Sequence, residues 1–279
     1  MSTLRSLLVH LDPSPGCMRR LLLARALAAR HGARVTALYA SLPSALSAPY
    51  VMAQGPADLL ATLQQLDIDH RDAARQRFDQ ALATDPGAVD WRELGVEPLI
   101  PGFATQALWH DLMVLGQFDP SDPLTTGVSA DFVPSVLVAS GRPALILPFV
   151  DMREPVGGSV LVAWKSTRES ARAVSAALPL LQRAAQIHLV LADEPGTEPA
   201  HAAALEAYLR AHDVGGPVRH RPSLAAGSAG DALLSLAADV GADLLVMGCY
   251  GHSRARELVL GGASRTVLRS MTLPVLMAH

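Results

Sequence analysis

The sequence predicts an α/β protein made of two copies of one strand-and-helix unit, each an open parallel sheet flanked by helices. Short apolar runs rich in Val and Leu alternate with helical patterns along the whole chain. The apolar runs show little alternation with polar residues, as expected for parallel strands that are covered on both faces. Two segments also recur: DLMVLG (111–116) returns as DLLVMG (243–248), and SVLVASGRPALILP (135–148) returns as TVLRSMTLPVLMAH (266–279).

The first copy opens with LRSLLVHL (4–11), a short apolar run that predicts a buried strand rather than a signal peptide. The pattern RRLLLARALAARHG (19–32) repeats apolar residues at helical spacing, and Gly32 fits a C-terminal cap. RVTALYA (34–40) predicts the next strand. Strands that alternate with helices imply right-handed crossovers.

A long insertion follows, roughly residues 42–90. It contains the amphipathic helical pattern ADLLATLQQLDIDHRDAARQRFDQALA (57–83), which carries four leucines on one side: Leu59, Leu60, Leu63 and Leu66. This helix either packs on the sheet, covers a pocket or presents a surface to a partner. The equivalent segment of the second copy, EPAHAAALEAYLRAHD (198–213), is shorter.

The linker PFVDMREPVGGS (148–159) separates the copies, because its prolines and glycines interrupt both strand and helix patterns. We therefore predict domains at 1–150 and 157–279. In the second domain, VLVAWKSTRESARAV (160–174) repeats the opening strand and helix of the first.

Composition excludes several classes of protein. Half of the residues are hydrophobic and 18% are charged, which predicts a globular protein with a large core. A formal net charge of −3 and the absence of a basic stripe argue against nucleic-acid binding. No apolar run approaches the ~18 residues that span a bilayer. Cys17 and Cys249 are too few for a disulfide framework, so we expect a cytoplasmic location.

The sequence shows no catalytic or metal-binding signature. The ten histidines lack the spacing of metal ligands, and neither a G-x-S-x-G elbow nor a G-x4-GK[ST] loop is present. No catalytic base is evident. Metal and catalytic residues are therefore predicted to be absent.

The segment LLVMGCYGHSRARELVLGGAS (244–264) places four glycines around a polar loop: Gly248, Gly251, Gly261 and Gly262. Ligands of open α/β sheets bind beyond the carboxyl ends of the strands, where this loop lies. The glycines could bring main-chain N–H groups close to a phosphate, at the N-terminus of the helix that follows. They could equally serve only to form tight turns.

The spacing G-x2-G-x9-G, from Gly248 through Gly251 to Gly261, resembles the signature of the universal stress protein family. The whole segment 243–279 and the opening VLVAWKSTRESARAV are also similar to that family. The resemblance covers nearly the whole chain as two tandem domains, with a degenerate loop in the first. It implies a five-stranded parallel, Rossmann-like sheet in each domain, pairing through the last strand and a role in stress survival.

Some members of the family bind ATP, and the resemblance carries their contacts onto the second domain. The adenosine end would lie near Ala163, Lys165 and Leu191. The phosphates, with Mg, would be held at the glycine loop and the residues beside it: Met247, Gly248, Gly251, His252, Gly261, Gly262, Ala263 and Ser264.

Both domains depart from the family pattern. Lys165 stands where the family usually has Asp, and Gly262 stands where it usually has Ser or Thr. The first domain keeps the acid, Asp12, but its loop GQFDPSDPLTTGVSADFVPS (116–135) carries aspartates that would repel phosphates: Asp119, Asp122 and Asp131. The first domain is thus predicted to be a structural partner or a pocket for a different ligand.

These observations predict a stress-response protein that binds an adenine nucleotide in its second domain without efficient turnover. The alternatives are a ligand-free scaffold that recruits a partner through residues 57–83, and a slow ATPase or self-phosphorylating protein. The two domains are expected to form a pseudo-twofold pair through residues 144–148 and 275–279, and two chains could form a homodimer.

Overall fold

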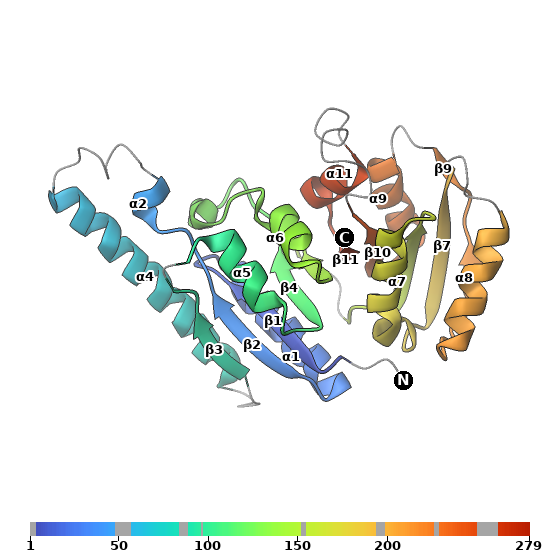
Figure 1. Cartoon of the computed structure of the whole chain (residues 1–279), viewed down its shortest axis with the longest axis horizontal. Helices are drawn as coiled ribbons and strands as arrows, with labels where there is room; N and C mark the ends of the chain where they lie inside the picture. The colour runs from blue at the N-terminus through green and yellow to red at the C-terminus, as the bar shows by residue number, and fades with distance from the viewer. Residues whose placement is uncertain are drawn as a thin grey trace. The chain divides into compact units, whose positions relative to one another are not determined.

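A computed structural model of the chain describes residues 4–47, 57–83, 89–95, 97–151, 155–193, 199–225, 229–249 and 262–279. It confirms the predicted fold class, a mostly parallel open α/β sheet flanked by helices (Figure 1). Contacts divide the chain into two compact units, Leu4–Ser140 and Gly141–His279, called here the N-terminal and the C-terminal unit.

Within its described residues, the N-terminal unit has four parallel strands in the order β3-β2-β1-β4. They are β1 (Ser6–Leu11), β2 (Arg34–Tyr39), β3 (Val89–Glu93) and β4 (Leu112–Gly116). The helices are α1 (Gly16–His31), α2 (Ser44–Ser47), α4 (Ala57–Leu82), α5 (Leu99–Ala107) and α6 (Phe132–Ser140), with a short 3-10 turn η1 (Pro123–Gly127). Gly32 ends α1 in the left-handed conformation, φ 65°, which confirms the predicted cap.

The C-terminal unit has a run of parallel strands in the order β11-β10-β6-β7-β8. They are β6 (Ser159–Trp164), β7 (Gln186–Asp193), β8 (Val218–His220), β10 (Leu244–Gly248) and β11 (Val275–Ala278). β9 (Leu224–Ala225) adds a short pairing with β7, and β5 (Ala144–Leu147) pairs with β11. The helices are α7 (Arg168–Leu181), α8 (Pro199–Ala211), α9 (Ala229–Asp239) and α11 (Ala263–Ser270).

The pairing of β5 with β11 is antiparallel, with Leu145 opposite Leu276. These are the two segments that the sequence analysis expected to pair with one another. The arrangement of the domains as a pseudo-twofold pair stays a prediction. Among the helices that the structure describes, none has the length and apolar character needed to cross a membrane.

The repeated aspartate of the DLMVLG and DLLVMG segments has the same structural role in both units. The Asp111 carboxylate accepts hydrogen bonds from the main-chain N–H groups of Arg5 and Ser6, at 2.8 and 3.0 Å. The Asp243 carboxylate accepts three, from Gly157 at 2.7 Å and from Gly158 and Ser159 at 3.0 Å. Each aspartate therefore fixes the start of the neighbouring first strand, β1 or β6, which explains why this residue recurs.

Asp243→Ala is expected to lower the free energy of unfolding by about 2 kcal/mol, because it leaves three partly buried N–H groups without their acceptor. Urea titration followed by circular dichroism measures the change. Asp239→Ala is the matched control, since Asp239 is an exposed aspartate at the end of α9. Equal stability of the two variants would contradict the role given to Asp243.

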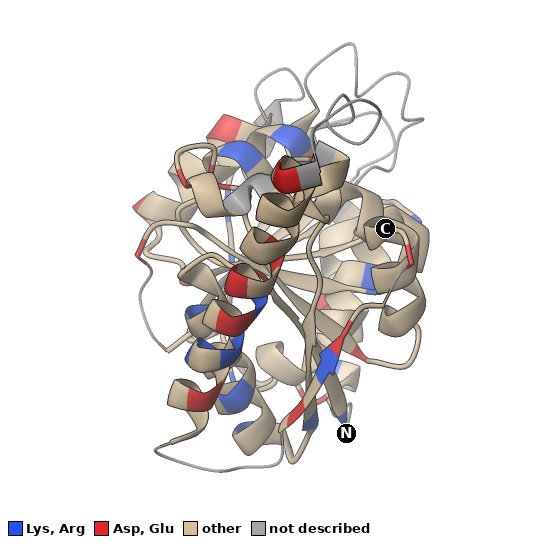
Figure 2. Ribbon diagram, turned by 90° about the vertical axis from the view of Figure 1, so that its left-hand side faces the viewer, with Lys and Arg blue, Asp and Glu red and all other residues tan. Residues whose placement is uncertain are grey.

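The predicted insertion helix is present as α4, but its two halves differ. Its C-terminal half packs on α1 in the same unit, with Ala74, Phe78 and Ala81 buried. Its N-terminal half leaves Leu59 and Leu66 about two-fifths exposed, at 40% and 41%. Basic and acidic residues are interspersed along α4, so this helix has no continuous basic stripe (Figure 2).

Candidate functional site

The three residues predicted to contact adenosine lie at the carboxyl ends of β6 and β7, beside β10. Ala163 lies opposite Met247 of β10, and Leu191 of β7 lies opposite Trp164, the last residue of β6. Lys165 follows directly and is half-buried. Residues far apart in the chain thus meet at one edge of the sheet, where ligands of this fold class bind.

Gly248, at the end of β10, lies directly under the first turn of α7. A Cβ atom at this position would lie 2.5 Å from the Ser170 nitrogen and 2.7 Å from the Glu169 carbonyl carbon. Such distances do not occur for real Cβ atoms, and main-chain atoms cannot move aside cheaply. Close packing of helix on strand is therefore sufficient to require glycine here.

The N-terminus of α7 is capped from within the chain. The Thr167 hydroxyl accepts a hydrogen bond from the Ser170 N–H at 3.3 Å, and the Lys165 N–H donates to the Ser170 hydroxyl at 3.3 Å. The first turn of α7 is therefore capped by side chains of the chain itself and needs no ligand to satisfy the Ser170 N–H.

Glu169, in that same turn, is an acid that the sequence analysis missed. It is only 3% exposed and is ion-paired with Arg168. Burial alone would raise the pKa of this carboxyl, but its hydrogen bonds, the one from Arg168 foremost, hold the pKa below its ordinary value. The motif T-R-E-S (167–170), an N-cap threonine with an acid in the first turn, is the signal that could have identified it.

The N-terminus of α11 differs from that of α7, because its N-cap residue, Gly262, has no side chain with which to cap it. Its preceding residue, Gly262, is extended, with φ −55° and ψ 154°. Within the part of the chain that the structure describes, the N–H groups of Gly262 and Ala263 donate no hydrogen bond. Two main-chain donors and the positive end of a helix dipole therefore remain at this end of α11.

The other predicted phosphate contacts divide into two groups. Ser264 is buried at 3% exposure, inside the first turn of α11. Gly251, His252 and Gly261 lie outside the described residues.

A serine–histidine contact lies beside the same edge and was also not foreseen. The Ser166 hydroxyl is 2.9 Å from Nδ1 of His201, which joins the loop after β6 to the start of α8. Ser166 is exposed. The contact positions α8 against this loop.

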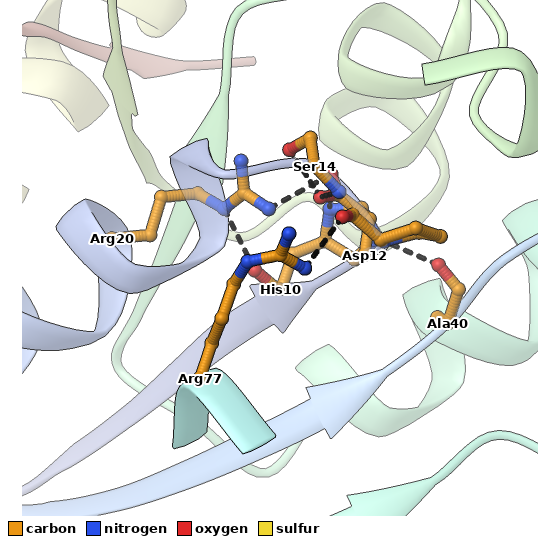
Figure 3. A network of polar contacts seen from close by, with 7 residues as sticks. His10, Asp12, Ser14, Arg20, Ala40 and Arg77 are labelled. Carbon is orange, nitrogen blue, oxygen red and sulfur yellow. Dashed lines mark hydrogen bonds and ion pairs between the residues drawn. The ribbon is translucent and has the colours of Figure 1, made fainter. Parts of the chain in front are cut away.

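The equivalent edge of the N-terminal unit holds a buried polar network (Figure 3). The Asp12 carboxylate is 2.8 Å from Nη2 of Arg20 and accepts hydrogen bonds from the N–H and hydroxyl of Ser14. Arg20 also donates from Nε to the His10 carbonyl at 2.8 Å. Burial would raise the pKa of Asp12, but Arg20, His10 and these hydrogen bonds lower it on balance, so the carboxylate is ionised.

His10 is a neutral member of this network. Its Nε2 is 2.8 Å from the Ala40 carbonyl, which can only accept, so Nε2 carries the proton. Its ring packs against Phe103 and Phe132, with centroids 5.3 and 4.6 Å away. Burial, opposed by Asp12, lowers the pKa of His10 to about 4.

The aspartates of the first loop are used locally. Asp119 accepts from the N–H and hydroxyl of Ser121, at 2.9 and 2.7 Å, and Asp122 accepts from the Leu124 N–H at 2.9 Å. They cap turns at this end of β4, and the unsuitability of this loop for phosphate stays a prediction.

Both cysteines are buried, each 1% exposed, and burial raises the pKa of Cys17 to about 11. A thiol with such a pKa is unreactive at neutral pH. Across the described ranges no group of three or more His, Cys, Asp or Glu residues could hold a metal ion.

Comparison with known proteins agrees with this architecture. The Universal stress protein family profile matches residues 158–279. Universal stress protein Slr1230 of Synechocystis is 45% identical over 53 residues, a match that covers 19% of this chain and only 18% of that protein.

One solved structure shows the same fold across nearly the whole chain. A universal stress protein from Archaeoglobus fulgidus DSM 4304 is similar over 98% of this chain and 95% of its own, with a TM-score of 0.71 at 16% identity. A universal stress protein solved in complex with cAMP is 33% identical over 43% of this chain and 95% of its own, with a TM-score of 0.34. Through its domain at residues 158–279, the chain belongs to the universal stress protein family.

Proposed function

We propose that the C-terminal domain binds an adenine nucleotide at the carboxyl ends of β6 and β10 and does not turn it over efficiently. The observation that carries this proposal is the N-terminus of α11, whose N-cap residue Gly262 has no capping side chain. Among the described residues, the N–H groups of Gly262 and Ala263 have no hydrogen-bond acceptor. Helix N-termini of this kind bind phosphate through main-chain donors and the helix dipole.

The rest of the edge suits the other parts of the ligand. Ala163 and Leu191 are half-buried and would provide main chain and apolar surface for an adenosine group, whereas Met247, opposite Ala163, is buried and would offer main chain alone. Lys165, which replaces the usual acid, adds a positive charge that favours phosphate oxygens. Mg would be held mainly by the phosphates and water, because the described residues offer no cluster of ligands for it.

Binding rather than catalysis is supported by the state of Glu169. This acid lies next to the site but is buried and ion-paired with Arg168, so it is not positioned to activate a water molecule. The protein would then act as a nucleotide-responsive stress protein in the cytoplasm.

Calorimetric titration of the whole chain with Mg·ATP, carried to millimolar concentration, tests the proposal. Wild type should bind with saturation, and Gly251→Val should lose binding, because a branched side chain in the glycine loop blocks the approach of main chain to phosphate. Gly215→Val is the control, since Gly215 is an exposed glycine of the same unit and its added Cβ would meet nothing within 4 Å. Equal binding by all three proteins would contradict the assignment of the loop.

One observation favours a second function, a scaffold that recruits a protein partner through α4. On its N-terminal half Leu59, Leu66 and Ile68 are 40%, 41% and 45% exposed. Apolar side chains that gather on an exposed helix are typical of a surface that binds another protein. A scaffold of this kind would give no heat with Mg·ATP, so the same titration separates the two functions.

A further inference from the structure

The two units place different residues at equivalent positions of their sheets. Leu11 ends β1 opposite Tyr39 of β2, as Trp164 ends β6 opposite Leu191 of β7. The residues that follow, Asp12 and Lys165, are therefore equivalent. In the same way Gly116 ends β4 and Gly248 ends β10.

Arg20 fills the space beyond β1 and β4 in the N-terminal unit. A Cβ atom at Gly116 would collide with Nη1 of Arg20 and would lie 3.3 Å from its Cζ. A Cβ atom at Gly16 would lie 3.4 Å from the same Nη1. Two glycines thus border the guanidinium of Arg20, a residue only 4% exposed, at the position where the C-terminal unit has its candidate ligand edge.

Both oxygens of the Asp12 carboxylate have partners inside the unit. Arg20 neutralises its charge, and Ser14 donates to it twice. An external ligand that needed this acid would have to displace a buried, hydrogen-bonded ion pair, which is costly.

The C-terminal unit lacks both members of this pair. Counting from the equivalent positions Asp12 and Lys165, an offset of 165 − 12 = 153, Arg20 corresponds to Ala173 of α7. Ala173 is fully buried and small, and the residue at the position of the acid is itself a cation. The acid and its internal cation are present together in one unit and absent together from the other.

We propose that the N-terminal unit is closed to external ligands because Arg20 serves as its built-in ligand, a guanidinium bound to Asp12 at the edge where the fold otherwise binds small molecules. The unit then contributes structure, and ligand binding is confined to the C-terminal unit.

Chemical rescue tests this inference. Arg20→Ala leaves Asp12 without its cation, and its unfolding temperature should fall by roughly 10 °C. Guanidinium chloride at up to ~20 mM, far below denaturing concentrations, should raise that temperature again and reach a plateau, because the free ion refills the vacated site. Sodium chloride at the same ionic strength should not.

Arg25→Ala is the matched control. Arg25 is on the same helix, and its guanidinium donates to the Ala81 carbonyl. Neither this variant nor wild type should gain stability from guanidinium. A guanidinium response equal in all three proteins, or none in Arg20→Ala, would overturn the proposal.

A measurement on wild type covers the case in which Arg20→Ala does not fold. In a proton–nitrogen NMR spectrum the Arg20 Nε–H, assigned by its loss in Arg20→Lys, should exchange slowly with water, because it donates to His10 in a buried site. It should also be unchanged by saturating Mg·ATP. Fast exchange, or a shift on nucleotide addition, would show that the site is open.

Discussion

Gly248→Val is expected to lower the free energy of unfolding by about 3 kcal/mol or more, because its side chain would overlap main-chain atoms of α7. Helix α7 would have to move away from β10, and the candidate nucleotide edge would be distorted with it. Urea unfolding of Gly248→Val and of the control Gly215→Val measures the difference.

The result also separates the two interpretations of the glycine motif. If Gly248 served only to admit a phosphate, the valine variant would keep wild-type stability and lose nucleotide binding alone. That outcome would contradict the packing role given to Gly248. Loss of stability together with binding would support it.

Acidification is expected to destabilise the protein through His10. The folded pKa of His10, about 4, lies below its ordinary value of 6.5, so the folded state binds its proton less readily than the unfolded chain does. The associated stability is fully present above pH 6.5 and is lost as pH falls towards about 4, by roughly 3 kcal/mol in all. Asp12, whose folded pKa is also lowered, extends the loss to still lower pH.

Thermal unfolding measured between pH 7 and pH 4 checks this dependence. His10→Gln is the control variant, because glutamine can still donate to the Ala40 carbonyl but does not titrate. Its stability should change less over that pH range than that of wild type. Parallel profiles for the two proteins would exclude His10 as the cause.

Patterns that depend on local chain geometry were predictable from the sequence. The buried parallel strands follow from apolar runs without alternation, and the end of α1 follows from Gly32. The repeat of DLMVLG as DLLVMG correctly located β4 and β10. Its aspartates were seen as part of a repeat, but their bonds to another strand were not.

Features that depend on tertiary packing were not predictable. Arg19 and Arg20 are adjacent in one helical pattern, yet only Arg20 is buried, because the rotation of α1 on its sheet directs that residue towards Asp12. The leucines of α4 left open whether this helix packs on the sheet, covers a pocket or meets a partner, and in the structure Leu59 and Leu66 are about two-fifths exposed.

The glycine motif shows the same limit within a few residues. Its spacing suggested one shared role, but the geometry gives the glycines different ones. Gly248 allows α7 to pack closely on β10, whereas Gly262 is the N-cap residue of α11 and provides no side-chain cap. Spacing alone cannot distinguish these roles, because glycine is favoured wherever a Cβ atom does not fit.

The stoichiometry of Mg·ATP binding to the whole chain tests the central claim most directly. With nucleotide bound in the C-terminal domain and the N-terminal edge filled by Arg20, calorimetry should find one saturable site per chain. Two sites per chain would contradict the closure of the N-terminal unit. Absence of binding up to millimolar Mg·ATP would contradict nucleotide binding itself, and would leave the exposed half of α4 as the basis of function.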